Sequence, residues 1–313
     1  MSRPLTISLI APIYGVERYI AKFADSVLSQ SYPHIEFIFV NDGTKDRSIE
    51  ILDALIDEKY SHLSPQIKII HKENGGLPAA RKTGLEHATG DYIWHIDSDD
   101  WIAEGAVERI AEQLAKEESD VLYFDFYKEY EDRCKLKRER DYNSSQRDLY
   151  IHNMFNHRSY ASVWNKCIKR TLYTNHELFH PKYGYAEDCY LVAQLVGRAR
   201  TIKHLAEPLY HYRKGNPLAL TRQSYKKRKR EYALNFIDLY QRYVAVPEAE
   251  NPLRSIIDQI PMRVGVMSIL YGLGLFAEFK WLSEALRHSP LRLGTQSWIV
   301  MQIVAKIYAT LHR

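Results

Sequence analysis

The chain has 313 residues, of which 45% are hydrophobic and 26% charged, and its formal net charge is +4 at pH 7. This composition is ordinary for a soluble globular protein, and the length allows one large domain or one domain with a substantial appendage. The three cysteines form no metal-ligand spacing, and their odd number argues against a disulfide framework, so a reduced, cytosolic setting fits best. The short apolar run before Pro12 predicts a first strand and argues against a signal peptide.

The charge is distributed unevenly along the chain. Residues 1–197 hold 24 Lys and Arg against 31 Asp and Glu, whereas residues 198–313 hold 19 against 8. A basic C-terminal third predicts an anionic partner such as a membrane surface, a phosphate-bearing ligand or nucleic acid. We rank nucleic acid last and predict no nucleic-acid partner, because no zinc-finger or RNA-recognition signature accompanies the basic residues.

The first half of the chain alternates strand patterns with helix patterns. Strands are predicted at residues 6–11, 35–40, 67–71 and 92–96, and helices at residues 16–30, 47–60, 78–88 and 104–116. Repeated strand–helix units predict an α/β fold with a mainly parallel, doubly wound sheet. Ligands bind such sheets at the carboxyl ends of the strands.

The middle of the chain is less regular. Asp120–Tyr130 predicts a further strand, and the charged segment Arg133–Arg140 predicts an exposed linker or a hairpin. A helix is predicted from Glu187 to about Gly197, and Pro208–Tyr210 is strand-like.

From Gln223 onward the pattern is helical and basic. The uncharged run 264–277 is shorter than the roughly 20 residues that span a bilayer, which favours a packed or interfacial helix. Residues 291–313 have the composition of an amphipathic surface helix. Docking on the chain's own domain or on a second subunit is the alternative.

The most informative stretch is Ile93–Trp101, which places Asp97, Asp99 and Asp100 directly after an apolar strand. Neighbouring carboxylates repel one another and are costly to desolvate. Three of them at a strand end therefore indicate a cation or ligand hydroxyls, although a solvated acidic loop explains an isolated motif of this length equally well. The surrounding sequence favours the first interpretation.

Polar residues also follow the other predicted strands. They are Pro12 and Tyr14, Asn41 and Asp42, and Asn74 to Gly76. Because the carboxyl ends of parallel strands meet at one edge of a sheet, we expect all of these groups and the aspartates to converge.

Taken together, these residues resemble the family 2 glycosyltransferases, a large inverting group with the GT-A (Rossmann-like) fold, over roughly residues 7–221. The motifs that carry the resemblance occur in the family's order. They are Pro12-Ile13-Tyr14, Val40-Asn41-Asp42-Gly43, Glu73-Asn74-Gly75-Gly76-Leu77, Ala79-Ala80-Arg81, Gly90-Asp91-Tyr92, Asp97-Ser98-Asp99-Asp100-Trp101, Trp164-Asn165-Lys166, Glu187-Asp188 and His211-Tyr212-Arg213. Departures from the family pattern occur at Gly15, Lys45, Pro78 and Lys82, and they concern the donor sugar more than the reaction class.

The resemblance implies a nucleotide-binding set. Asp42 accepts a hydrogen bond from the uracil base, and Pro12 and Tyr14 wall the ring. Close backbone approach at Gly76 and contacts of Arg81, Asp97 and Ser98 with phosphate or ribose complete the set. Local alternatives are an Asx turn for Asp42 and a salt bridge from Arg81 to one of the aspartates.

A Mn²⁺ or Mg²⁺ cofactor is implied as well. Asp99 is its direct ligand, Asp97 holds the ribose or assists the metal, and His211 completes the metal shell. Asp100 stays open between capping the following helix and tuning the site. Arg213 contacts the diphosphate, with packing as the alternative.

The implied catalytic base is Asp188, supported by Glu187, which alternatively contacts the acceptor. The simpler interpretation is that both acids complement the dipole of the helix that they begin. Trp164 and Lys166 shape the acceptor side by resemblance, or serve packing only.

The resulting prediction is a metal-dependent inverting enzyme that moves a hexose or N-acetylhexosamine from a UDP-sugar to a saccharide acceptor. The acceptor implied is lipid-linked, as in bacterial capsule, O-antigen or exopolysaccharide synthesis. We expect residues 1–221 to form the GT-A domain, with a nucleotide half over 1–117 and an acceptor half over 118–221. The helical region 222–313 is expected to bind the inner face of the cell membrane or to form a homo-oligomer. The alternative is a non-catalytic sugar-nucleotide or glycan-binding protein of the same fold.

Overall fold

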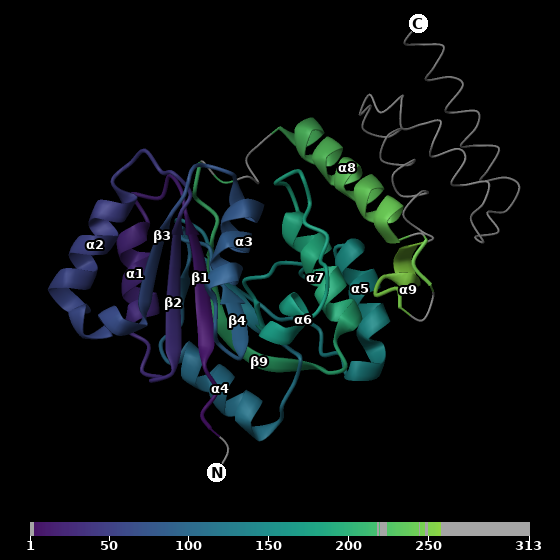
Figure 1. Cartoon of the computed structure of the whole chain (residues 1–313), viewed down its shortest axis with the longest axis horizontal. Coiled ribbons are helices and arrows are strands. Elements are labelled where there is room, and N and C mark those ends of the chain that lie inside the picture. Colours follow the sequence, from purple (N-terminus) through teal and green to yellow (C-terminus); the bar gives the residue numbers. More distant parts are fainter. Residues whose placement is uncertain (1–2, 218, 220–223, 244, 248–249, 258–313) are drawn as a thin grey trace, which may run out of the picture.

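The computed structural model describes residues 3–217, 219, 224–243, 245–247 and 250–257, which form an α/β structure around a nine-stranded sheet (Figure 1). The strands are β1 (Ile7–Ile13), β2 (Ile35–Asn41), β3 (Ile67–His71), β4 (Tyr92–His95), β5 (Trp101–Ile102), β6 (Val121–Glu129), β7 (Cys134–Lys137), β8 (Lys166–Lys169) and β9 (Ile202–Arg213). The helices of the described residues are α1 (Ile20–Leu28), α2 (Ser48–Lys59), α3 (Leu77–His87), α4 (Ala106–Lys116), α5 (Arg147–Phe155), α6 (Arg170–Thr174), α7 (Glu187–Arg198), α8 (Tyr225–Tyr243) and α9 (Arg254–Ile257), with short 3-10 turns η1 (Ser61–Gln66) and η2 (Ser144–Gln146).

The strand order is β3-β2-β1-β4-β8-β6-β9-β5, and β7 pairs with β6 outside this path. Strands β1 to β4 run parallel to one another, and β6 is parallel to β9. Strand β8 lies antiparallel between β4 and β6, so β6 and β9 run in the same direction as β1 to β4. The predicted mainly parallel α/β sheet is confirmed.

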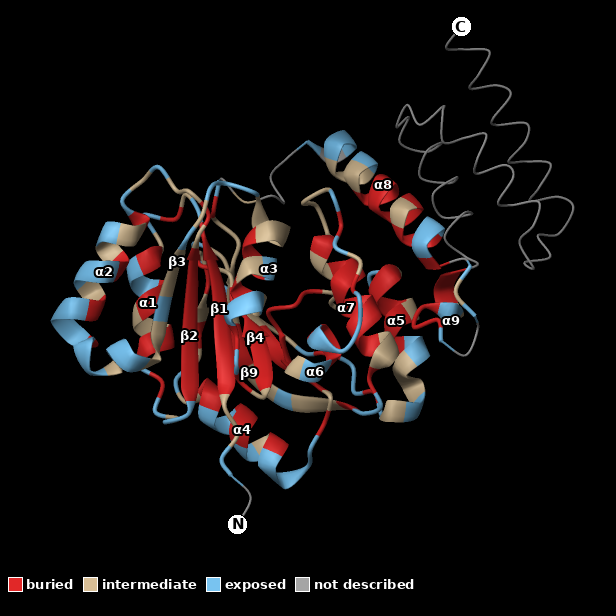
Figure 2. Cartoon of the chain, viewed as in Figure 1, coloured by how far each residue is buried: buried red, intermediate tan, exposed pale blue. Residues whose placement is uncertain are grey.

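Both faces of the sheet are covered. Figure 1 shows α1 and α2 on one side of β1 to β3, with α3 on the other side. Leu9 and Phe39 pack into the core that α1, α2 and α4 share, whereas Ile10 and Val40 point to the opposite core with α3, α5, α7 and α8. Burial on both faces is why β1 and β2 are almost continuously apolar, and Figure 2 shows them buried along their length.

The predicted elements agree with the structure in kind, and their ends differ by a few residues. The first helix begins at Ile20 and not at Val16, because Gly15 has a φ of +67° and the Val16 amide donates to Ser48 Oγ at 3.2 Å. The charged segment after β6 forms a hairpin through β7, which was one of the two alternatives.

The C-terminal part of the described chain packs onto the domain. Side chains of α8 such as Phe236 and Ile237 belong to the same core as α5 and α7. The predicted apolar run 264–277 and the amphipathic segment 291–313 lie outside the described residues. Among the helices that the structure describes, none is both long enough and apolar enough to span a bilayer.

Candidate active site

The ends of four parallel strands meet at one edge of the sheet, as expected. Ser98 Oγ donates to the Pro12 carbonyl at 2.6 Å, which joins the segment after β4 to the end of β1. Asn74 Nδ2, after β3, donates to the Asp42 carbonyl at 3.0 Å, after β2. Tyr14 is 55% exposed at this edge and is free to cover a planar ligand.

Asp42 is buried and holds the turn that precedes α3. Its carboxylate accepts the amides of Gly75 at 2.9 Å and Gly76 at 2.8 Å, and the Lys72 ammonium lies 2.6 Å away. Gly76 has a φ of +82°, a conformation that favours glycine. The structure therefore gives Asp42 a structural role at this edge through amides 33 and 34 residues away, which is not the local Asx turn that was its alternative, and its predicted contact with a nucleotide base stays a prediction.

The aspartates of the acidic segment Asp97–Asp100 differ in burial and in their hydrogen-bond partners. Asp97 is half-buried, whereas Asp100 is 1% exposed and accepts the Tyr210 hydroxyl at 2.8 Å and the Arg213 amide at 2.6 Å. Asp100 thus ties the segment to β9. It does not cap α4, whose N-cap residue is Gly105.

Asp99 Oδ2 accepts a hydrogen bond from Asn216 Nδ2 at 2.7 Å. Burial and the nearby Asp97 raise the pKa of Asp99, although the Asn216 contact opposes the shift. Burial, together with Asp99 and Asp97, also raises the pKa of Asp100 well above its usual range. The segment therefore carries negative charge that the protein leaves only partly compensated.

Arg81, in the second turn of α3, connects the acidic segment to α7. Its guanidinium is 4% exposed, forms an ion pair with Asp97 at 2.7 Å and a second one with Glu187. Although burial opposes it, the pull of Glu187, Asp97 and Asp188 raises the pKa of Arg81. The structure therefore contains the salt bridge from Arg81 to an aspartate that was the alternative interpretation of this residue.

Glu187 and Asp188 begin α7, and the preceding Ala186 has a left-handed φ of 60°. Glu187 pairs with Arg81, and local hydrogen bonds hold both carboxylates at the helix start, because the Asp188 amide donates to Glu187 at 2.7 Å and the Cys189 amide donates to Asp188 at 2.9 Å. Burial raises the pKa of Glu187 to about 8, with Arg81 opposing. Burial likewise raises the pKa of Asp188, again against the effect of Arg81.

His211 and Arg213 lie on β9 beside Trp101. His211 Nδ1 is 2.7 Å from Glu129 Oε1, and its ring stacks on Trp101 with centroids 5.0 Å apart. Burial lowers the pKa of His211, with Glu129 opposing. The Arg213 guanidinium lies 4.9 Å from the Trp101 ring and donates through Nε to the Asp99 carbonyl at 2.8 Å. Arg213 is therefore adjacent to the acidic segment, whereas the contacts of His211 lead to Glu129 and aromatic rings.

Trp164 and Lys166 are both buried. The Trp164 ring stacks on Tyr210 with centroids 4.6 Å apart. Lys166 Nζ donates to the carbonyls of Tyr160 at 3.0 Å and Ser162 at 2.8 Å, and burial lowers the pKa of Lys166 to about 8. Both side chains brace the segment before β8, so their predicted acceptor contacts stay a prediction.

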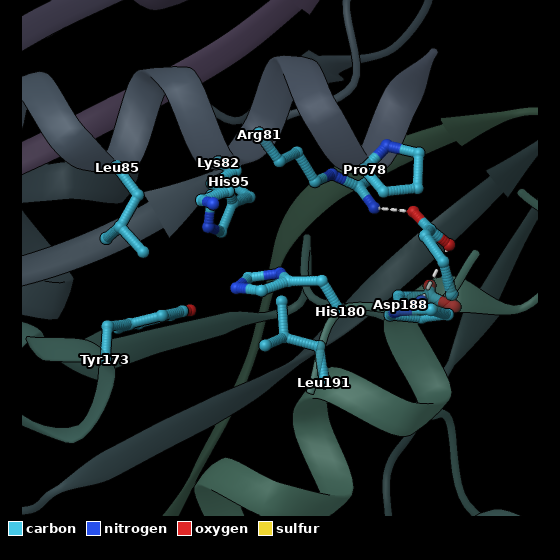
Figure 3. Close-up of a pocket in the computed structure, with 11 residues that line it drawn as sticks. Pro78, Arg81, Lys82, Leu85, His95, Tyr173, His180, Asp188 and Leu191 are labelled. Atoms are coloured by element: carbon cyan, nitrogen blue, oxygen red, sulfur yellow. Dashed lines mark hydrogen bonds and ion pairs between the residues drawn. The ribbon is translucent and has the colours of Figure 1, made fainter. Parts of the chain in front are cut away.

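A pocket next to Asp188 contains residues that the sequence patterns did not identify. It lies between α3 and α7, as Figure 3 shows, and its buried lining includes His95 and Tyr173. Neither residue stands in a polar motif, since His95 ends an apolar strand and Tyr173 lies in the five-residue helix α6. Asn216 and Tyr210 were missed as well, although Tyr210 belongs to the predicted strand-like run Pro208–Tyr210 and Asn216 follows Arg213 by three residues.

The residues at the sheet edge fit a hard divalent cation. Among the residues that the structure describes, no group of three or more His, Cys, Asp or Glu could hold a metal alone. Such a cage is not required at a nucleotide site, because Mg²⁺ is usually bound by one or two carboxylates together with substrate phosphates and water. The carboxylates of Asp97 and Asp99 supply oxygen ligands and excess negative charge of that kind.

Comparison with known proteins assigns the chain to a family. Residues 8–176 match the model of Glycosyl transferase family 2. EpsH of Bacillus subtilis (strain 168), which is named as a glycosyltransferase, is 32% identical over 253 residues, 79% of this chain and 70% of EpsH. The minor teichoic acid biosynthesis protein GgaB of the same organism is 29% identical over 66% of this chain, which spans only 23% of GgaB.

A solved structure shows the same fold. The crystal structure of S. aureus TarS 1-349 in complex with UDP-GlcNAc superimposes with a TM-score of 0.60 and 19% identity, over 90% of this chain and 89% of that one. In the longer TarS crystal structure, the match covers 49% of that chain. The predicted GT-A fold is therefore confirmed.

Proposed function

Because the chain belongs to glycosyl transferase family 2 and is a glycosyltransferase, we propose that it moves a hexose or N-acetylhexosamine from a UDP-sugar to a hydroxyl group of a glycan acceptor. The UDP-GlcNAc complex of TarS, a protein of the same fold, supports a UDP-sugar donor. The uracil base of the donor is proposed to lie between Pro12 and the exposed ring of Tyr14, at the edge of the sheet where Asp42 accepts the Gly76 amide.

The observation that carries this proposal is the ion-pair chain Asp97–Arg81–Glu187. It fixes the donor edge of the sheet against the start of α7, where Asp188 lies. Two carboxylate groups with different surroundings are thereby held on the two sides of one guanidinium. A transfer reaction needs such an arrangement, because one site must stabilise the departing diphosphate while another takes a proton from the acceptor.

A Mn²⁺ or Mg²⁺ ion held by Asp99, with Asp97 on the ribose or the metal, would stabilise negative charge on the leaving diphosphate. Asp100 holds β9 in place, and Arg213 and Ser98 are positioned beside the same segment. We propose His211 as a further metal ligand, although its Nδ1 lies within hydrogen-bonding distance of Glu129.

Asp188 is the proposed base. Its carboxylate accepts the proton of the acceptor hydroxyl as that oxygen attacks the anomeric carbon from the side opposite the diphosphate, which inverts the configuration. Burial raises the pKa of Asp188, and the charge of Arg81 opposes that rise. Arg81 therefore favours the carboxylate form of Asp188, which is the form that accepts a proton.

We further propose that the acceptor is a lipid-linked saccharide of a bacterial surface polymer and that the enzyme acts in the cytoplasm at the inner face of the membrane. The similarity to GgaB, a teichoic acid biosynthesis protein, supports the polymer class. The excess of basic residues over 198–313 supports contact with anionic lipids or phosphates. In this proposal residues 1–221 form the catalytic domain and residues 222–313 attach it to the membrane or to a second subunit.

Donor screening tests the proposed function. UDP release from a panel of UDP-sugars is measured with Mn²⁺, with Mg²⁺ and with a chelator. We expect one UDP-hexose or UDP-N-acetylhexosamine to be turned over in a metal-dependent manner. Tight UDP-sugar binding without turnover for any donor and acceptor fraction would favour the non-catalytic alternative.

Liposome sedimentation tests the membrane part. We expect the full chain to sediment with anionic vesicles at low salt and to be released as salt rises, because surface charges are screened. Equal sedimentation with neutral vesicles, or none with anionic ones, would favour an oligomer interface.

A further inference from the structure

One face of the neighbouring strands β7, β6 and β9 carries lysines that no carboxylate balances. Paired residues of adjacent strands point to the same face, and Lys128 of β6 is paired with Lys135 of β7 and with Tyr212 of β9. Lys137 lies two residues beyond Lys135 on β7 and points the same way. Among the residues that the structure describes, no Asp or Glu forms an ion pair with these three lysines, which we call the lysine face.

The arrangement of the lysine face is unfavourable for the fold by itself. Like charges directly opposite each other in an antiparallel pair are destabilising. Burial lowers the pKa of Lys128, and Lys135 adds to this shift while Tyr130 opposes it. Lys135 and Lys137 also oppose the rise in the pKa of Tyr160 that burial causes, so both ammonium groups lie near this ring. Three positive charges are thus concentrated around one tyrosine, which indicates an anionic ligand.

Protection of a sheet edge explains only part of the lysine face. In the described sheet, β7 pairs with β6 outside the main strand order, and lysines on such an edge strand discourage pairing with another chain. Lys128 lies instead on β6, between β7 and β9, where no edge needs protection. Its side chain is half-buried. A lysine at this central position therefore indicates binding.

The lysine face adjoins the acidic segment of the candidate active site. Tyr210, which donates to Asp100, lies two residues before Tyr212 and on the same face of β9. The Trp164 ring stacks on Tyr210 and Tyr212, with centroids 4.6 Å and 5.2 Å apart. A chain that leaves the active site can therefore pass over β9 and reach Lys128 on the adjoining strand.

A row of ammonium groups fits single negative charges that repeat along a chain. Lysine binds phosphate as a point charge, whereas the planar fork of arginine is the better match for a planar carboxylate. The rings beside the lysines already hold cations, because Lys128 Nζ lies 4.9 Å from the Tyr160 centroid and Lys214 Nζ 4.5 Å from the Tyr212 centroid. Proteins that bind single-stranded nucleic acids use aromatic rings to stack on bases. The chemistry here favours phosphodiester groups without bases.

We propose that the lysine face binds the phosphate groups of the acceptor chain, which is then a glycan or polyol polymer with phosphodiester links. The inference rests on the proposed function and adds a substrate class to it, because a neutral saccharide offers the three lysines no charge to bind. The acceptor chain runs from the active site across β9 to β6 and β7.

Binding of a phosphodiester chain without bases tests the inference. A fluorescein-labelled glycerol phosphate oligomer is titrated with the full chain, and fluorescence anisotropy is recorded at several salt concentrations. We expect the wild type to bind the oligomer with an affinity that falls as salt rises. Lys128→Gln, Lys135→Gln and Lys137→Gln should each weaken binding about fivefold, and the triple variant should weaken it at least about thirtyfold.

A charge-matched variant separates the lysine face from net charge. Lys116→Gln, Lys169→Gln and Lys203→Gln together also remove three charges, but at the opposite edge of the sheet, where α4 and β8 end and β9 begins. This variant should bind the oligomer within about twofold of the wild type, because distant surface charges are screened. Lys135→Glu guards against loss of the fold. It places opposite charges across β6 and β7, so its Tm should not fall below that of the wild type, while its oligomer binding should be weaker than that of Lys135→Gln.

The outcomes are distinct. Absence of oligomer binding by the wild type, or equal binding by the wild type and the triple variant of the lysine face, would overturn the inference. Tighter binding of single-stranded RNA or of a hyaluronan fragment than of an equally charged oligomer would overturn it in favour of a nucleic acid or a carboxylate polymer. Sedimentation with phosphatidylglycerol vesicles that the triple variant loses, without oligomer binding by the wild type, would assign the face to the membrane. UDP affinity of the wild type, measured by calorimetry, reports separately on the proposed function: UDP binding without oligomer binding refutes the inference alone.

Discussion

Arg81 shares one buried guanidinium between two carboxylates that lie on different elements, Asp97 after β4 and Glu187 in α7. A salt bridge from Arg81 to an aspartate was one of the alternatives offered by the sequence, but the ion pair with Glu187, 106 residues away, was not foreseen. What the patterns did indicate was the chemistry of each partner, an acid at a strand end and an acid at a helix start. The structure adds that all three act as one charged unit.

Removing the cation should destabilise the fold in a pH-dependent manner. Arg81→Met leaves Glu187 with an unpaired buried carboxylate, a change that typically costs about 3–5 kcal/mol of the free energy of unfolding. The folded-state pKa of Glu187 is already raised to about 8 and should rise further without Arg81. Well below pH 8 both folded proteins hold Glu187 protonated, so the Glu187 contribution to their difference appears only as pH approaches and exceeds about 8, where the wild type gains the Arg81-paired carboxylate and the variant does not. The loss should therefore be larger at pH 8 than at pH 5, as measured by urea denaturation.

An exposed arginine provides the matched control. Arg47 pairs with Glu50 at 3.1 Å, and their side chains are 70% and 72% exposed. Arg47→Met should change the free energy of unfolding by less than about 1 kcal/mol at either pH. An effect of Arg81→Met that is as small as this, or larger at pH 5 than at pH 8, would contradict the account.

At the scale of elements, β9 closes the site although it comes late in the chain. It carries Tyr210, whose hydroxyl donates to Asp100 and accepts the Asp97 amide at 3.1 Å. The sequence predicted only three strand-like residues there. Pro208 lies opposite Asp125 where the register with β6 shifts, and a strand with an internal proline and polar residues lacks the alternation that marks a strand.

Loss of the Tyr210 hydroxyl should loosen the acidic segment. Tyr210→Phe removes a partner of the buried Asp100 carboxylate, and we expect the free energy of unfolding to fall by about 1–3 kcal/mol. The KM for the UDP-sugar should rise, because Asp97 and Asp99 belong to the same segment. Tyr32→Phe, which removes a part-buried hydrogen bond to the Leu5 carbonyl, should reduce stability less and leave that KM unchanged. Equal effects of the two variants on KM would show that β9 does not position the segment.

Long periodic elements were predictable from sequence, whereas short ones were not. The strand at Ile67–His71 has its predicted bounds, and the helix that begins at Glu187 starts at its predicted residue. Strand β5, with two residues, is too short to show a period and forms because β9 pairs with it. Strand β8, which was also not predicted, is held between β4 and β6. As with β5, the pocket that involves α6 could not be foreseen.

At the scale of the whole molecule, the helices beyond the predicted domain boundary are continuous with its core. Tyr232 and Phe236 of α8 pack in the same core as Tyr190 of α7. The end of α7 also meets the segment before α9. A Cβ added to Gly197 would lie 2.0 Å from the Pro252 carbonyl oxygen, so this glycine permits close packing of the two segments.

This contact gives a stability prediction. Gly197→Ala should force the backbone at Pro252 away from α7 and lower the free energy of unfolding by about 1–3 kcal/mol, the usual cost of overpacking. Gly215→Ala is the control, because its added Cβ meets its nearest atom at 3.9 Å. Chemical denaturation of both variants measures the difference. A stability of Gly197→Ala equal to that of Gly215→Ala would mean that the segment before α9 does not pack on α7.

The most direct test of the central claim is the activity of Asp188→Asn. Removal of a general base typically lowers the rate about 10²–10⁴-fold. Donor binding should be preserved, because the proposed donor site is at Asp97 and Asp99, and Arg81 separates Asp97 from the start of α7. UDP release with the preferred donor and acceptor is measured beside UDP-sugar affinity by calorimetry. We predict a fall in kcat of at least about a hundredfold with donor affinity within about threefold of the wild type. Turnover within a few-fold of the wild type would contradict the role of Asp188 as the base.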